Sequence, residues 1–373
     1  MPGLSRHLLL SALTSLLSYA FLMVIANALG PAEYGSFSEA WSLLGFLLVF
    51  ATIAGYRATI RLDLVGRVRA EAGLYLLVSG ACVAASLLTG HGFLFLPAVV
   101  ASSAAQCVLA GRMLGQLRYA SAGLLNLACP LFKIAFFLCA PTAWSVELRI
   151  YGALLVATGL SALAGFWLTR KDPLAAPAQG SAGPAVTLAT ASHILPNADM
   201  LWLSVFGNSQ ASITIAPVAL ITRGLFFLQL IFAQWWLPRR HIHGRRLPLR
   251  KLFIGSILVV AISLAGVVIF RSMLVQLLGW EAPDLGLALW ASAAAAFAAI
   301  FYQNLQLAAL ATRNLLLLMP LFLILAGALL AGFLGCPPLS VHALALALYG
   351  CATALTVLLA RGRASADRGE NGP

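Results

Sequence analysis

The sequence predicts an all-α integral membrane protein with about twelve transmembrane helices, and three observations lead to that prediction. Hydrophobic residues make up 61% of the 373-residue chain and charged residues only 9%, and the mean hydropathy is +0.95. A soluble domain carries about a quarter charged residues, so lipid has to cover this much apolar surface. The apolar residues come in runs of spanning length, and the basic residues gather in every second connection between those runs.

The first half of the chain contains six runs that approach the roughly 20 apolar residues needed to span a bilayer. They lie at about 8–29, 40–60, 73–89, 92–111, 121–141 and 149–169. Arg6 and the Ala26-Asn27-Ala28 tripeptide imitate a signal peptide. However, the apolar region of a signal peptide is only about 7–15 residues long. We therefore expect the first run to remain as an uncleaved helix that ends in a polar turn from Leu29-Gly30 to Gly35.

The second half contains six further runs, at about 186–206, 213–237, 251–270, 285–309, 314–335 and 341–360. The segment between the two halves is rich in Pro, Ala and Gly, as an inter-domain linker is. We therefore predict a six-helix lobe at 1–170, a cytoplasmic linker at 171–185, and a second six-helix lobe with a cytoplasmic tail at 186–373. The Leu29-Gly30 and Phe206-Gly207 turns echo each other six helices apart, which favours a parallel repeat.

The distribution of lysine and arginine predicts that both chain termini are cytoplasmic. With that orientation the inner connections hold nearly all the basic residues outside the apolar runs, and the outer ones hold only Arg149 and Arg271. The net charge of +12 then reflects topology and contact with anionic membrane lipids, and no nucleic-acid partner is expected. The basic loop 238–250, with His241 and His243, fits the same lipid contact better than a metal site.

Four charged residues lie within predicted spans, namely Arg57, Lys133, Asp199 and Arg223. A charge at the centre of a membrane helix costs about 2.5–3.5 kcal/mol, so such residues usually face a cavity or a partner. Arg57 is close enough to the inner end of its helix to reach the cytoplasmic interface, so both interpretations stay open for it. For Lys133 and Arg223 the cavity interpretation is favoured.

Uncharged polar residues and prolines accompany these charges. Gln234 lies on the same helical stripe as Arg223, Asn197 lies close to Asp199, and Gln303 and Asn304 lie within a predicted span. Prolines occur within five of the predicted helices, where they bend the helix and free a backbone carbonyl. They are Pro97, Pro130, Pro196, Pro217 and Pro320.

The balance of charge in the spans predicts an anionic cargo. Three cations stand against one acid, and a low-dielectric cavity holds excess cations only when water or an anion fills it. The expected cavity residues are Arg223, Lys133, Arg57, Asn197, Gln234, Gln303 and Asn304, with Asp199 as the candidate for ion coupling. The sequence has no zinc-protease, P-loop or serine-hydrolase motif, and its six cysteines form no C-x-x-C pair. We therefore expect a protein that is not an enzyme, with no metal and no cofactor apart from a coupled proton or sodium ion.

The segment Asn27–Leu62 resembles the first two helices of polysaccharide flippases, which belong to the multidrug/oligosaccharidyl-lipid/polysaccharide exporter superfamily. The residues that carry this resemblance are Leu29-Gly30, Tyr34-Gly35, Gly55 and Arg57. The segment Asn197–Ile221 resembles the start of the second lobe in that family. It has Ala211-Ser212-Ile213 where the family has Gly-x-Tyr after the turn.

The resemblance implies two six-helix lobes around a central cavity. It also implies export of an undecaprenyl-diphosphate-linked oligosaccharide across the bacterial cytoplasmic membrane, with polysaccharide polymerase machinery as a further partner. Arginines on helices two and eight line the cavity in related lipid II flippases, and by position these correspond to Arg57 and Arg223. Alternating access of the two lobes would carry the headgroup across.

Three alternatives remain open. A major-facilitator transporter shares the twelve spans, and the loop from Asp63 to Arg69 imitates part of that family's motif. A multidrug exporter of the same superfamily would have acids in place of cations in its cavity. A membrane glycan polymerase would carry a large outer loop, whereas the outer segments here are short.

Overall fold

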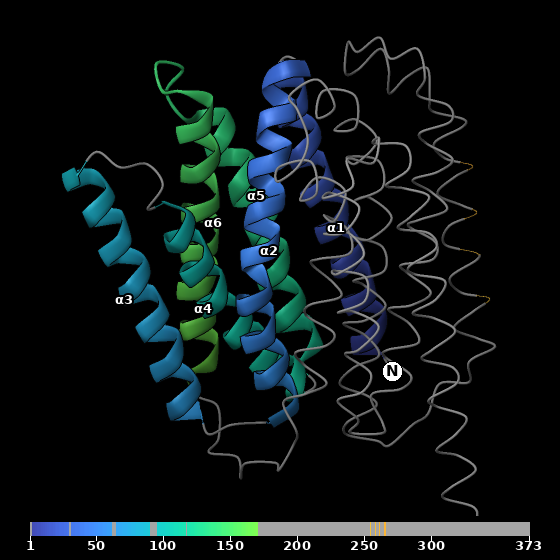
Figure 1. Cartoon of the computed structure of the whole chain (residues 1–373). Helices are drawn as coiled ribbons and strands as arrows, with labels where there is room; N and C mark the ends of the chain where they lie inside the picture. The colour runs from blue at the N-terminus through green and yellow to red at the C-terminus, as the bar shows by residue number, and fades with distance from the viewer. Residues whose placement is uncertain are drawn as a thin grey trace, which may run out of the picture. The chain divides into compact units, whose positions relative to one another are not determined.

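The computed structural model describes residues 2–29, 31–61, 65–89, 95–116 and 118–170, together with Ile254, Leu258, Ala261 and Ala265. The continuous part forms six α-helices (Figure 1). They are α1 (Pro2–Ala28), α2 (Pro31–Arg61), α3 (Val65–Thr89), α4 (Phe95–Gly115), α5 (Tyr119–Cys139) and α6 (Val146–Thr169). Each is long and apolar enough to cross a membrane. The six spans predicted for the first half are thus confirmed as helices, whereas those at 186–360 lie outside the described residues.

Two helix starts differ from the prediction. The prediction of a polar turn from Leu29-Gly30 to Gly35 is wrong, because α2 begins at Pro31 and runs through Glu33 and Gly35. Proline fits the first turn of a helix, and an acid there is stabilised by the helix dipole. Likewise α3 begins at Val65 instead of residue 73, so only residues 62–64 separate it from α2.

The prolines of α4 and α5 take different roles. Pro97 was expected to interrupt its helix, but it lies in the first turn of α4, which begins at Phe95. A first-turn N–H has no partner within the helix, so the proline costs nothing there. Pro130 does lie inside its helix, as predicted, and it is buried.

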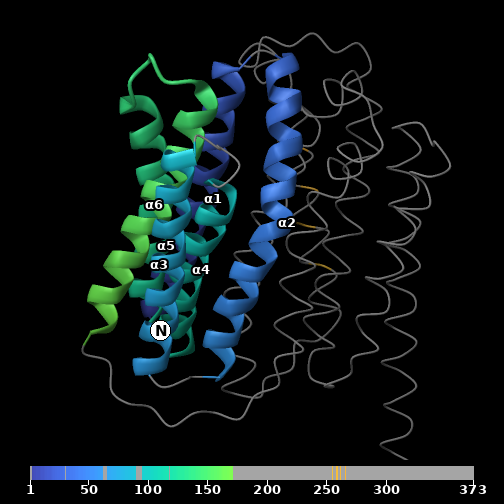
Figure 2. The same ribbon diagram turned by 60° about the vertical axis from the view of Figure 1, so that its left-hand side comes forward.

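The helices pack in a chain of neighbours. α3 packs against α4, α4 against α6, α6 against α5, and α5 against α1 (Figures 1 and 2). α4 is the central helix of this group and most of its residues are buried. These helices, with α2 from Leu44 onward, form one compact unit, and Gly30–Leu43 groups with a second unit. The predicted division into lobes 1–170 and 186–373 stays a prediction.

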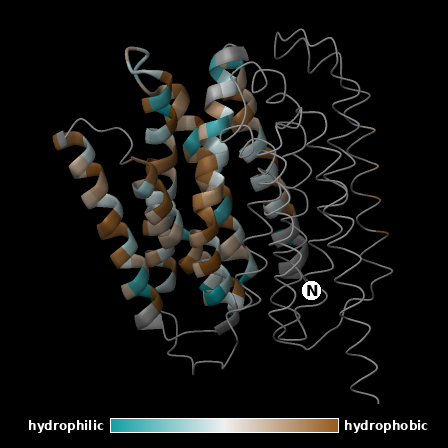
Figure 3. Ribbon diagram, viewed as in Figure 1, coloured by the Kyte–Doolittle hydropathy of each residue, from teal (hydrophilic) through white to brown (hydrophobic). Residues whose placement is uncertain are grey.

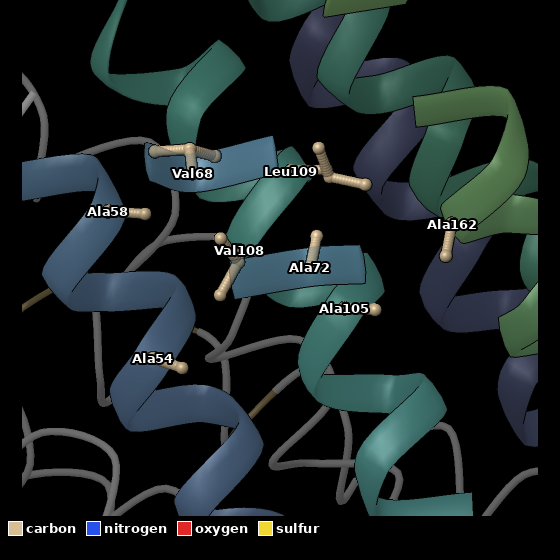
Figure 4. Packing of buried hydrophobic residues seen from close by; sticks show 8 residues of the cluster. All are labelled: Ala54, Ala58, Val68, Ala72, Ala105, Val108, Leu109 and Ala162. Carbon is tan, nitrogen blue, oxygen red and sulfur yellow. The ribbon is translucent and has the colours of Figure 1, made fainter. Parts of the chain in front are cut away.

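Small residues form the core where α2, α3, α4 and α6 meet (Figure 4). Its buried members are Ala54, Ala58, Val68, Ala72, Ala105, Val108, Leu109 and Ala162. Alanine has little side chain to separate two backbones, and close backbone approach is a main source of helix association in lipid. The alanines therefore explain why four helices can converge at one place.

Glycine brings α2 and α4 still closer. A Cβ atom on Gly111 would lie 2.1 Å from the carbonyl oxygen of Gly55, and one on Gly55 would lie 2.9 Å from that of Cys107. Both distances are too short for any side chain, because the obstructing atoms belong to the backbone. The crossing of α2 and α4 therefore requires glycine at both positions.

Many large apolar side chains of the described helices are exposed. Hydrophobic residues, brown in Figure 3, occur along all six ribbons. On α3 alone, Leu74, Leu77, Leu87 and Leu88 are exposed. Soluble proteins rarely expose apolar residues in such numbers, whereas a helix in lipid loses nothing by doing so. The surface is that of a protein surrounded by membrane.

Several hydroxyl groups in the spans donate to a carbonyl oxygen of their own helix, four residues earlier. The donors are Thr14, Ser42, Thr59, Thr158 and Thr169, with distances from 2.7 to 3.0 Å. Each of these polar groups is therefore satisfied without a neighbouring helix.

Candidate functional site

Arg57 is ion-paired across two adjacent helices. It lies near the end of α2, and its guanidinium donates to the carboxylate of Glu71 on α3. The hydroxyl of Tyr75, one helical turn further along α3, donates to the other carboxylate oxygen at 3.2 Å. Arg57 lies near the end of α2 and Glu71 near the start of α3, so the two side chains meet although they are 14 residues apart in the sequence. The result is a small charged cluster, Arg57–Glu71–Tyr75, that is partly buried.

Glu71 was not among the predicted site residues, because it lies between the predicted spans 40–60 and 73–89, in a connection expected to be cytoplasmic. A signal was present: Val68 and Ala72, four residues apart, are both buried, and Tyr75 and Leu76 continue the same helical face. This periodicity begins before the purely apolar run. Since Glu71 neutralises Arg57, the count of three cations against one acid omitted a carboxylate.

Lys133 lies on the inward stripe of α5. Cys129 and Phe137, one turn to either side of it, are both buried, while Lys133 itself is half-buried. The ring of Phe137 contacts that of Phe21 on α1 at a centroid distance of 6.1 Å. The lysine therefore lies on the side of α5 that faces other helices of its unit.

Within the described helices Lys133 has no carboxylate partner, since the ion pair found there joins Arg57 to Glu71. The structure also shows no hydrogen bond between Arg57 and Lys133. The two predicted cations of this half therefore differ: one is neutralised by an acid, and the other is not. The remaining predicted site residues lie outside the described residues and stay predictions. They are Asn197, Asp199, Arg223, Gln234, Gln303 and Asn304.

Two further arginines lie close to helix ends. Arg149 donates to the carbonyl oxygen of Phe137 at 2.7 Å, and its guanidinium lies 4.6 Å from the centre of the Phe137 ring. This joins α6 to α5 beside the connection between the two helices. Arg112, expected in the connection 112–120, belongs to the last turn of α4 and is fully buried. A cation suits a helix C-terminus because of the helix dipole.

The described residues hold no cluster of three or more His, Cys, Asp or Glu that could bind a metal ion. The four described cysteines, Cys82, Cys107, Cys129 and Cys139, are free thiols.

No family model and no curated protein matches this sequence. Solved structures do. An outward-facing multidrug resistance MATE family transporter of the MOP superfamily has a TM-score of 0.62 at 15% identity, covering 98% of this chain and 96% of that one. A MATE transporter in complex with MaL6 gives a TM-score of 0.64 at 14% identity and the same coverage.

A MOP superfamily transporter from Pyrococcus furiosus, whose binding pocket is described as having reverse polarity, has a TM-score of 0.54 at 12% identity over 95% of each chain. These identities are low, so the likeness is one of fold. With its apolar exterior and six membrane-length helices in the described part, the chain is a multi-pass membrane protein with the fold of MOP superfamily transporters.

Proposed function

We propose that this protein is a flippase that carries an undecaprenyl-diphosphate-linked oligosaccharide from the cytoplasmic to the outer leaflet of the bacterial cytoplasmic membrane. The transporter fold supports export in general. The observation that favours this cargo is Lys133, a cation within a membrane span, on the inward stripe of α5, without an acid partner in the described helices.

The argument from Lys133 is one of compensation. A charge in a low-dielectric site is retained only when water, an ion or a partner compensates for its lost hydration. The span Tyr119–Cys139 contains no acid. A diphosphate would supply the missing negative charge, while the polyprenyl chain stays in lipid. In this proposal Arg223 is a second cation for the headgroup, and Asn197, Gln234, Gln303 and Asn304 bind the sugars.

Other parts of the proposal follow from the same cargo. Arg57 joins the site through its pair with Glu71, and Asp199 is the candidate for proton or sodium coupling. The delivered oligosaccharide would be a substrate for a glycan polymerase at the outer face. Since an inside-negative potential drives anions outward, at about 2.3 kcal/mol per charge for 100 mV, the potential itself would assist export of a diphosphate.

A multidrug exporter is the second candidate function, because the structural neighbours include multidrug MATE transporters. Binding a cationic drug requires a carboxylate within the membrane. Glu71 is ion-paired with Arg57. Among the other acids of the described helices, Glu33 and Glu147 are exposed and Glu39 is half-buried in α2, so Glu39 is the acid that such a function would use. The two functions therefore depend on residues of opposite charge.

The test compares Lys133→Ala, Lys133→Arg and Glu39→Gln in a deletion strain, with the leaflet that holds the lipid-linked oligosaccharide as the readout. We expect Lys133→Ala to lower translocation by about tenfold or more, the factor that corresponds to 1.4 kcal/mol. Lys133→Arg should retain most of the rate. Normal translocation in the deletion strain itself, without a redundant flippase, would refute the cargo. Loss of drug resistance on Glu39→Gln, with Lys133→Ala active, would favour the multidrug function.

A further inference from the structure

The Arg57–Glu71 ion pair is accessible yet not fully hydrated. The Arg57 side chain is 30% exposed and the Glu71 side chain 19%. A pair sealed in the core would be closed to any ligand, and one on an open surface would be screened by water and worth little. At this intermediate exposure the attraction is appreciable, and a small anion can still approach the guanidinium.

The backbones around the pair are fixed independently of it. Ala54 and Ala58 on α2 pack with Val68 and Ala72 on α3, on the helical turns next to the pair (Figure 4). Separation of Arg57 from Glu71 therefore needs side-chain rotation only. Rotation of exposed side chains is much faster than movement of packed helices.

Tyr75 provides Glu71 with a partner that does not depend on Arg57. Its hydroxyl donates to one carboxylate oxygen at 3.2 Å, while Arg57 donates to the other. When Arg57 turns away, the carboxylate keeps one hydrogen bond and does not become an isolated charge, which would be far more costly. Arg57 in turn has a spare donor, since its buried Nε–H has no acceptor in the described part of the chain.

The other arginines with a spare Nε–H in these helices are held differently. The guanidinium of Arg69 lies 5.8 Å from the centre of the Phe166 ring, and that of Arg149 lies over Phe137. Aromatic rings do not exchange with an anion. Of these three arginines, Arg57 alone is held by a carboxylate, a group that another anion can replace.

We propose that Glu71 is a built-in competitor for the anionic cargo at Arg57: it neutralises Arg57 in the empty protein and yields the guanidinium to the cargo's diphosphate, while Tyr75 retains the displaced carboxylate. This inference rests on the proposed function, because it takes the diphosphate as the arriving anion. Phosphate is a good competitor, since arginine binds it in the same bidentate manner as carboxylate and a diphosphate carries more charge. The pair thereby keeps the empty site from holding smaller anions.

The test measures binding of inorganic diphosphate to the purified full-length protein by calorimetry. Glu71→Gln removes the competitor, and we expect diphosphate to bind about tenfold more tightly, as loss of a nearby like charge predicts. In Glu71→Gln/Arg57→Gln the gain should disappear. Tyr75→Phe should weaken binding, because the released carboxylate loses its remaining partner. Arg69→Gln, two residues from Glu71 but directed at α6, is the matched control and should leave binding unchanged.

The outcomes separate this inference from the proposed function. Binding that Lys133→Ala abolishes but Glu71→Gln leaves unchanged would overturn the competitor role and keep the cationic site. A gain that persists after Arg57→Gln would also overturn it. No binding to the wild type or to any variant would remove the cationic site of the proposed function as well. If Glu71→Gln does not fold, Glu71→Asp serves instead, because the shorter side chain keeps the charge but moves it away from Arg57 by one methylene group. An unchanged affinity for diphosphate in Glu71→Asp would equally refute the competitor role of Glu71.

Discussion

Single residues decide how closely the helices of this protein approach. At Gly111 a side chain would meet the carbonyl oxygen of Gly55, and at Gly152 it would meet the Phe136 ring at 2.8 Å. At Gly80 and Gly159 a Cβ atom would meet nothing within 4 Å. Since an aromatic ring can rotate and a backbone carbonyl cannot, these positions should differ in tolerance. The expected cost of a substitution by alanine therefore decreases from Gly111 to Gly152, and Gly80 and Gly159 serve as controls.

Gly111→Ala is expected to destabilise the protein by about 3 kcal/mol or more, because the contact falls on backbone and overpacking alone commonly costs 1–3 kcal/mol. Thermal denaturation of the purified protein would measure this. Gly159→Ala is the control, and it should be neutral or stabilising by up to about 1 kcal/mol through helix propensity. Equal denaturation midpoints for the two variants would contradict the close contact of α2 with α4.

The charged cluster illustrates what residue-scale reasoning can and cannot predict. Arg57 and Lys133 could be selected from the sequence, because a charge inside an apolar run is visible in one dimension. The different surroundings of the two residues could not be predicted from the sequence, because Arg57 on α2 pairs with Glu71 on the next helix, α3. Pairing across a connection depends on where the second helix begins, and that boundary was misplaced by eight residues (73 against 65).

At the scale of elements, the six helices were predictable and their ends were not. Hydropathy marks the part of a helix that lies in lipid, whereas helical hydrogen bonding continues into the polar interface. α2 shows the difference: its first residues, with Glu33 and Ser36, are polar, yet they continue the helix that crosses the membrane. Windows that detect spans therefore shorten helices that extend beyond the bilayer.

Contacts between elements also include polar ones. The hydroxyls of Ser102 on α4 and Thr158 on α6 lie 2.6 Å apart, and both residues are buried. We expect Thr158→Val and Ser102→Ala each to destabilise the protein, with a coupling energy of about 1 kcal/mol, the usual range for such bonds in membranes being roughly 0.6–1.7. A double-mutant cycle from unfolding in detergent would measure it.

Thr14→Val is the matched control for that cycle. Like Thr158, Thr14 donates to a carbonyl of its own helix, at Leu10, but in the described part of the chain it has no bond to a second helix. It should couple to neither Ser102 nor Thr158. If the changes in the free energy of unfolding caused by Ser102→Ala and Thr158→Val add up in the double variant, the bond between α4 and α6 contributes nothing to stability.

At the scale of the whole molecule, the distribution of basic residues predicts the orientation of every helix end. The end of α5 should be external, and Cys139, the last residue of that helix, is an exposed free thiol. In a variant that keeps Cys139 and no other cysteine, we expect a membrane-impermeant maleimide to label intact cells. The rate should be that of an exposed thiol, because Cys139 is not covered by other residues in the described part of the chain.

The control for this labelling places the thiol at the opposite face. Ser5→Cys combined with Cys139→Ser should react only after the cells are permeabilised, since the N-terminus is predicted to be cytoplasmic. The reverse pattern, with Ser5→Cys labelled in intact cells, would invert the topology and place the basic connections outside.

The hydroxyls that bond within their own helices have a consequence for how the protein is made. Thr14, Thr59, Thr158 and Thr169 bring no unsatisfied donor with them, so each helix can leave the translocation channel for lipid before its neighbours have been synthesised. Arg57 and Glu71 cannot do so separately at the same low cost, since each is a bare charge until the other arrives. With only residues 62–64 between α2 and α3, the two helices would enter the bilayer together as a neutral hairpin. Helices whose hydroxyls bond within the same helix would then insert into the membrane one at a time. Helices joined by an ion pair, as α2 and α3 are, would insert as a pair.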